Sequence, residues 1–189
     1  MKKIVLLIVM VAFTITATAQ IEKETKYGFR IGANYSTLEG DNLDNLESRI
    51  GMHASFFAEV PLSSRLSLVP ELGLSALGVN ERELRLPSGD IVEAKTNWLQ
   101  VTVLAKVNLS EKFYLQLGPQ AGVNVTEKDD NDLYNYDFSA VGGVGYLFNE
   151  NFGVDVRYGY GLSNIYDNAF EVNNEANNRY FQLGLSYRL

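Results

Sequence analysis

The sequence contains no cysteine and a single histidine, His53, among its 189 residues. The lack of cysteine excludes a disulfide framework, a thiolate metal site and a lipid anchor attached to cysteine. One histidine is too few for a metal centre built from several histidines. The chain also lacks a basic stripe and carries a formal net charge of −7, so we expect no nucleic-acid partner.

The chain has one long apolar run, at its start. Lys2 and Lys3 precede ten unbroken apolar residues at 4–13, and small residues follow, ending in Ala17-Thr18-Ala19. A basic segment, an apolar segment and an A-x-A site in this order are typical of a cleaved signal peptide. A helix that crosses a bilayer needs roughly 20 apolar residues. We therefore predict a signal peptide at residues 1–19 and an exported mature domain at residues 20–189.

Apolar residues alternate with small or polar residues through most of the mature chain. Alternation with period two predicts β-strands that have one apolar face. It recurs in eight segments, at residues 27–35, 50–60, 66–76, 99–109, 113–125, 136–148, 152–162 and 181–189.

The connections between these segments alternate in length. Tight turns are expected at residues 61–64, 110–112 and 149–151, and long polar loops at residues 38–48, 80–95, 126–135 and 163–177. Short turns at one end and long loops at the other are typical of an outer-membrane barrel. An even number of strands places both termini on the short-turn side, which is the periplasmic side in such barrels.

The composition of the polar face distinguishes a membrane barrel from a soluble sandwich or lipocalin. A soluble barrel turns its polar face to water and fills it with charged residues. Here that face is mostly Gly, Ser, Thr, Gln and Asn, as suits the crowded interior of an eight-stranded barrel. Its few charged residues are Arg30, Arg49, Glu59, Glu71, Lys106, Asp137, Asp155, Arg157 and Arg188.

The apolar face carries almost no charge and many aromatic residues, which predicts a lipid-facing surface with aromatic girdles near the strand ends. Its aromatic residues are Tyr27, Phe29, Tyr35, Phe113, Tyr136, Phe138, Tyr146, Phe148, Phe152, Tyr158, Tyr160, Phe181 and Tyr187. The last segment alternates up to Leu189, as in the C-terminal insertion signal of outer-membrane barrels, although that signal usually ends in Phe. The four long loops hold 15 acidic and four basic side chains, so the acidity lies on the outer face.

Two prolines interrupt the predicted strands. Pro70 and Pro119 cannot donate a backbone hydrogen bond, and proline inside a sheet is normally confined to edges or bulges. A closed barrel has no edge, so we expect a local bulge at each. A seam weakened for lateral opening is the alternative.

The candidate sites for chemistry are few. His53 and Ser55 share a face, but side chains two apart on a strand lie about 6.6 Å apart along it, so we expect His53 to be an interior packing residue. The acidic loop at residues 127–132 lacks the glycine and terminal glutamate of a calcium loop. Five interior charges are expected to pair as a structural plug, because unpaired buried charges are very costly: Arg30, Glu71, Lys106, Asp155 and Arg157. We predict no catalytic, cofactor-binding or metal site.

Three strand motifs resemble the PorT-like outer-membrane barrel family: Leu68-Val-Pro-Glu-Leu-Gly73, Phe113-Tyr-Leu-Gln-Leu-Gly-Pro-Gln-Ala-Gly122, and the segment at residues 152–165. The resemblance extends over residues 27–189 and implies an outer-membrane location. The fourth segment differs, because the family commonly reads Tyr-Leu-Glu-Ile-Pro where this chain has Trp98-Leu-Gln-Val-Thr102. Gln100 therefore replaces an interior acid. The protein that gives this family its name takes part in protein secretion, but barrel motifs alone do not imply that role for this chain.

The sequence thus predicts an all-β, eight-stranded antiparallel up-and-down transmembrane β-barrel, monomeric and embedded in outer-membrane lipid. We expect a non-catalytic structural or surface-interaction role through acidic extracellular loops, with a lumen filled by side chains. The alternatives are a narrow pore or small-ligand transporter, a lipid-modifying enzyme and a secreted soluble lipid binder. The sequence does not identify the partner of the loops.

Overall fold

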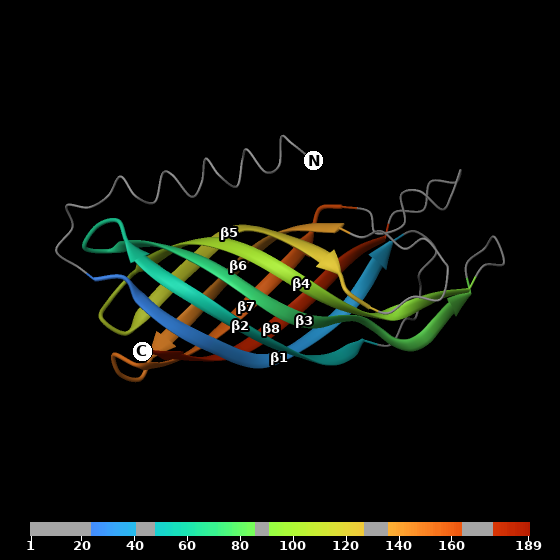
Figure 1. Cartoon of the computed structure of the whole chain (residues 1–189), viewed down its shortest axis with the longest axis horizontal. Helices are drawn as coiled ribbons and strands as arrows, with labels where there is room; N and C mark the ends of the chain where they lie inside the picture. The colour runs from blue at the N-terminus through green and yellow to red at the C-terminus, as the bar shows by residue number, and fades with distance from the viewer. Residues whose placement is uncertain (1–23, 41–47, 86–90, 127–135, 164–175) are drawn as a thin grey trace.

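A computed structural model describes residues 24–40, 48–85, 91–126, 136–163 and 176–189. The chain forms one barrel, with the short turns and the C-terminus at one end and the strand ends that flank the longer connections at the other (Figure 1). We call these the short-turn end and the long-loop end. The predicted signal peptide lies outside the described residues, as do parts of the predicted long loops. Within the described residues no helix is long and apolar enough to span a membrane.

Eight antiparallel strands close on themselves in sequence order, and β1 pairs with both β2 and β8. This closure confirms the predicted barrel. The strands are β1 (Lys26–Gly40), β2 (Arg49–Pro61), β3 (Leu66–Arg85), β4 (Ile91–Asn108), β5 (Phe113–Asn124), β6 (Tyr136–Leu147), β7 (Phe152–Gly161) and β8 (Ala176–Arg188).

The alternation read from the sequence becomes an apolar outside and a mostly polar inside. On β8, Phe181, Leu183 and Leu185 are more than half exposed, whereas Gln182 and Ser186 between and beyond them are buried. The same period runs through β5 and β7. The molecule is therefore inverted relative to a soluble barrel, and its outer surface suits hydrocarbon.

The hairpin of β3 and β4 is longer than the sequence predicts. Residues 80–85 and 91–95, expected within a long loop, continue the two strands, with Glu83 opposite Glu93 and Arg85 opposite Ile91. Figure 1 shows this hairpin reaching beyond the others at the long-loop end. The expected loop was wrong because strands beyond the lipid zone need no apolar face. Their backbone hydrogen bonds can therefore continue without an alternation of apolar and polar residues. The register shifts between Gly78, which has a φ of 104°, and Glu83.

The predicted bulges at the two prolines are wrong. Pro70 pairs with Val103 and Pro119 pairs with Ala140, and the strand register does not shift at either proline. Each proline instead faces a short gap in pairing on its other side, towards β2 and β4 respectively. The missing amide donor removes ladder bonds without inserting a residue, so the barrel keeps its register.

Glycines inside the barrel make room for the largest inward side chains. The ring of Tyr114 lies over Gly145 on β6, and the ring of Tyr180 lies over Gly159 on β7. A Cβ at either glycine would overlap the ring. The high glycine content is thus a packing requirement of a narrow lumen.

Candidate functional site

Four buried charges form a neutral cluster inside the barrel, which we call the central cluster: Arg30, Glu71, Asp155 and Arg157. Arg30 Nε lies 2.9 Å from Asp155 Oδ2, and Arg157 Nη1 lies 2.9 Å from Glu71 Oε2. Arg157 Nε also lies 3.2 Å from Asp155 Oδ1, which links the two pairs. Three strands, β1, β3 and β7, are tied together across the lumen. The predicted pairing of these four charges is confirmed.

His53 and Ser55 enter this cluster through different partners. His53 Nε2 contacts Arg30 Nη1, whereas Ser55 Oγ donates to Glu71 Oε1 at 2.7 Å. Gln182 accepts from Arg30 at 2.6 Å and donates to Asn34 at 2.9 Å. His53 and Ser55, which share an inward face, therefore extend the hydrogen-bond network of the central cluster.

Two apolar groups, which the sequence did not reveal, also fill the lumen. Phe57, Val69, Leu104 and Val141 form one cluster, and Leu77, Trp98 and Tyr180 form the other. The Tyr180 hydroxyl accepts a hydrogen bond of 2.7 Å from Gln120. These residues follow the inward parity of their strands. The sequence signal that could have revealed them is an apolar side chain at an inward position, where most other residues are polar.

Lys106 does not join the central cluster. Its Nζ binds both carboxylate oxygens of Glu59, at 2.8 and 2.9 Å, and Arg188 Nη2 binds the same carboxylate at 3.0 Å. We call these three residues the basal cluster. It lies in the wall of a cavity of about 1060 Å³, the vestibule, formed by the three short turns and the strand ends around them.

Asp137, near the long-loop end, is buried among neutral donors. Its carboxylate accepts hydrogen bonds of 3.0 Å from each of Ser139 and Ser163 and one of 3.4 Å from Asn178. On the outer face of the same end, Arg179 Nε lies 2.7 Å from Glu39, and the Arg179 guanidinium stacks 3.5 Å from the Tyr160 ring centroid.

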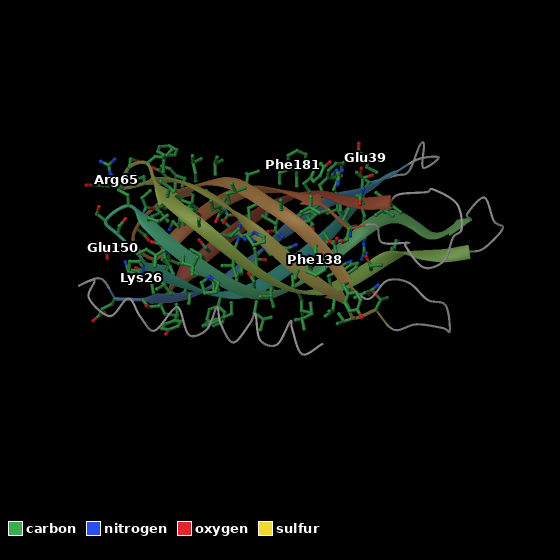
Figure 2. All side chains as sticks on the ribbon, turned by 90° about the horizontal axis from the view of Figure 1, so that it is seen from above. Lys26, Glu39, Arg65, Phe138, Glu150 and Phe181 are labelled. Atoms are coloured by element: carbon green, nitrogen blue, oxygen red, sulfur yellow. The ribbon has the colours of Figure 1, made fainter. Side chains whose placement is uncertain are left out.

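Aromatic side chains on the outside contact one another in pairs. Phe113 and Tyr146 pack with ring centroids 4.9 Å apart near the short-turn end, and Tyr158 and Phe181 do so on β7 and β8. Figure 2 shows the outward side chains, with Phe138 and Phe181 nearer the long-loop end and Arg65 and Glu150 at the short turns. Such belts form where a barrel meets the two lipid interfaces.

No group of three or more His, Asp or Glu residues that could hold a metal ion occurs within the described part of the chain. The acidic loop at residues 127–132 lies outside the described residues. The described features with the most polar groups that could bind a ligand are therefore the charged clusters of the lumen and the vestibule.

Comparison with protein families gives a match over residues 18–167 to the family described as outer membrane protein beta-barrel domain. The chain belongs to this family. Membership and the apolar outer face agree on an integral outer-membrane protein.

Solved structures of outer-membrane barrels have the same fold. Neisserial surface protein A, NspA, superposes with a TM-score of 0.55 at 12% identity, covering 88% of this chain and 100% of that one. Ail of Yersinia pestis in a phospholipid bilayer nanodisc gives 0.52 at 15% identity, again covering 88% and 100%. At such identities the likeness is one of fold. Comparison with curated proteins gave no match.

Proposed function

We propose that this family member is a non-catalytic surface-contact protein of the outer membrane, acting through four acidic loops outside the cell. The observation that carries the proposal is the difference in charge between the barrel interior and the loops. Inside the barrel the central cluster is neutral, whereas the four loops read from the sequence hold 15 acidic and four basic side chains. The four loops are the part of the chain that we propose meets a partner, and they also carry most of its negative charge.

The filled lumen supports a role on the surface. Arg30, Leu77, Trp98 and Leu104 are each no more than 1% exposed inside the barrel. An eight-stranded barrel leaves room for its side chains and little else. A solute would have to displace the central cluster or the apolar groups, so transport is disfavoured.

The charge of the loops selects the kind of partner. A surplus of 11 negative charges at one end attracts cationic surfaces and repels polyanions. One crystal structure of Ail holds a heparin analogue, sucrose octasulfate. For this chain we propose the opposite preference, a positively charged protein or peptide surface.

The orientation follows from the topology of such barrels. Both termini and the three short turns lie in the periplasm, after export by a signal peptide at residues 1–19. The closed ladder between β1 and β8 leaves no strand edge for a neighbour, which favours a monomer. The strand motifs at residues 68–73, 113–122 and 152–165 support placement in the PorT-like branch. No secretion role is included in the proposal.

The absence of cysteine makes a direct test of orientation simple. Single cysteines are introduced as Asn131→Cys in a long loop and Glu111→Cys in a short turn, and intact cells are treated with a membrane-impermeant maleimide. The proposal requires labelling of the first variant only, with both labelled after lysis. Labelling of Glu111→Cys on intact cells would reverse the orientation.

A second experiment tests the partner. Asp129, Asp130 and Asp132 are changed together to Asn, and binding of a cationic polypeptide to the protein in nanodiscs is compared with wild type. Binding should weaken and its salt dependence should fall. A matched variant, Glu111→Gln and Glu150→Gln in the short turns, should leave binding unchanged. Equal binding by the loop variant would refute the role of the loop charges.

A further inference from the structure

The basal cluster has more positive than negative charge. Lys106 and Arg188 both pair with Glu59, and their side chains are only 4% and 7% exposed. Within the described residues Glu59 is the single carboxylate within 4.0 Å of either cation. Two nearly buried cations therefore share one anion, in contrast to the balanced central cluster.

Arg188 also keeps an unused donor. Its Nε is buried without a hydrogen-bond partner among the described residues, and its Nη1 reaches only the Glu150 carbonyl, at 3.5 Å. Lys106 Nζ has Glu59 as its hydrogen-bond acceptor and otherwise lies 4.3 Å from the ring centroid of Tyr114. A guanidinium has five donors arranged to bind oxyanions in pairs, so this one is only partly satisfied.

The surplus charge adjoins an open space of suitable size. The vestibule of about 1060 Å³ is bordered by Lys106 and Arg188, and further cations, Lys26, Arg65 and Lys112, also line it. Lys26 and Arg65 lie at the same end of the barrel (Figure 2). Counting the described lining residues, five cations face four carboxylates. Cavities of this size hold small molecules.

We propose that the vestibule is a binding site for a small anionic solute whose carboxylate or phosphate group is held by Arg188 and Lys106. The solute supplies the second negative charge of the basal cluster and accepts from the Arg188 guanidinium. The cations are deep and almost fully covered, so a compact anionic group fits better than a large surface. If the short-turn end is periplasmic, as proposed above, the solute comes from the periplasm.

The NMR signal of the Arg188 Nε–H group tests this site without knowledge of the natural ligand. The refolded mature protein in a non-ionic detergent is titrated with inorganic phosphate and, separately, with succinate. Sodium chloride at matched ionic strength is the control. We expect a saturable shift of the Arg188 signal, with a dissociation constant in the millimolar range or below. The stronger of the two probes indicates a phosphorylated or a carboxylate ligand.

Two variants change the binding in opposite directions. Arg188→Gln removes the donor and with it the reporting signal, so binding to this variant is followed by isothermal titration calorimetry, and saturable binding should be abolished. Glu59→Gln removes the competing carboxylate, frees both cations, and should tighten phosphate or succinate binding about tenfold. Arg179→Gln, a cation at the long-loop end, is the matched control and should leave binding unchanged. Heat-modified mobility on gels checks that each variant is folded.

The gain expected for Glu59→Gln keeps the proposal falsifiable even where Arg188→Gln fails to fold. A shift produced equally by chloride, the lack of a saturable shift with both anions, or unchanged affinity in Glu59→Gln would each overturn it. None of these results bears on the loops at the opposite end, so the surface-contact proposal is tested separately.

Discussion

Arg157 and Glu71 lie 86 residues apart in the sequence and join β7 to β3 inside the barrel, where Arg157 Nη1 contacts both carboxylate oxygens at 3.1 and 2.9 Å. Both side chains are at least nine-tenths buried. A buried pair of this kind contributes little net stability by its presence, but the loss of one partner leaves an uncompensated charge. The pair therefore offers a sharp test of the filled lumen.

The first prediction concerns this pair. Glu71→Gln should lower the free energy of unfolding by about 3–5 kcal/mol, because it leaves an excess of buried positive charge on Arg30 and Arg157. Urea unfolding of the refolded protein, followed by the fluorescence of the single tryptophan, Trp98, measures this loss. Glu150→Gln, on an exposed turn, should change stability by no more than about 0.5 kcal/mol.

The double variant Glu71→Gln and Arg157→Gln separates a pair interaction from a general loss of packing. It removes opposite charges together, so its destabilisation should be clearly smaller than the sum of the single effects. Strict additivity of the two single effects would contradict a direct interaction.

The second prediction concerns the glycines that face large rings. Gly159→Ala places a methyl group on the Tyr180 ring and should cost about 1–3 kcal/mol, the usual range for overpacking. The matched control is Gly142→Ala, whose Cβ would meet the flexible end of Leu117 at 3.3 Å. Equal unfolding midpoints for the two variants would show that Tyr180 does not pack as described.

The third prediction concerns the outer face. Leu183 on β8 and Leu109 at a short turn have similar exposed fractions, 54% and 59%. Arginine near the bilayer midplane costs about 2–4 kcal/mol and near the interface about 0–1 kcal/mol. Leu183→Arg should therefore unfold at a much lower urea concentration in vesicles than Leu109→Arg. Identical behaviour would argue that this face does not meet hydrocarbon.

The fourth prediction concerns conduction. The wild-type protein in planar bilayers should give no steady conductance steps, because the central cluster and both apolar groups occupy the lumen. Regular steps in the wild type that change size in Arg157→Ala would favour the pore or transport alternative over the surface role.

The inside and outside of the barrel could be predicted from the sequence because strand geometry assigns each residue a face by parity. Parity alone identifies Arg30 and Asp155 as interior residues. The partner of each charge could not be predicted, since it depends on the register between strands. Lys106 illustrates this limit, because it pairs with Glu59 at the short-turn end and not with the central cluster.

The length of a strand was harder to predict beyond the lipid-facing zone, because lipid there does not require alternating apolar residues. The extension of β3 and β4 through Arg85 and from Ile91 has no alternating apolar face, so its strands read as loop. Trp98 and Leu77 were on the inward face by parity, but their packing with Tyr180 joins strands that are distant in sequence. The vestibule likewise arises only when three turns come together.

The most direct test of the account is the mobility of the mature protein refolded into phospholipid vesicles, run on a detergent gel with and without boiling. A closed barrel stabilised by cross-lumen contacts should resist the detergent and migrate faster unboiled than boiled, and it should sediment with the vesicles. Identical mobility, together with solubility in buffer without detergent, would contradict the account, because the apolar face would then be an internal core.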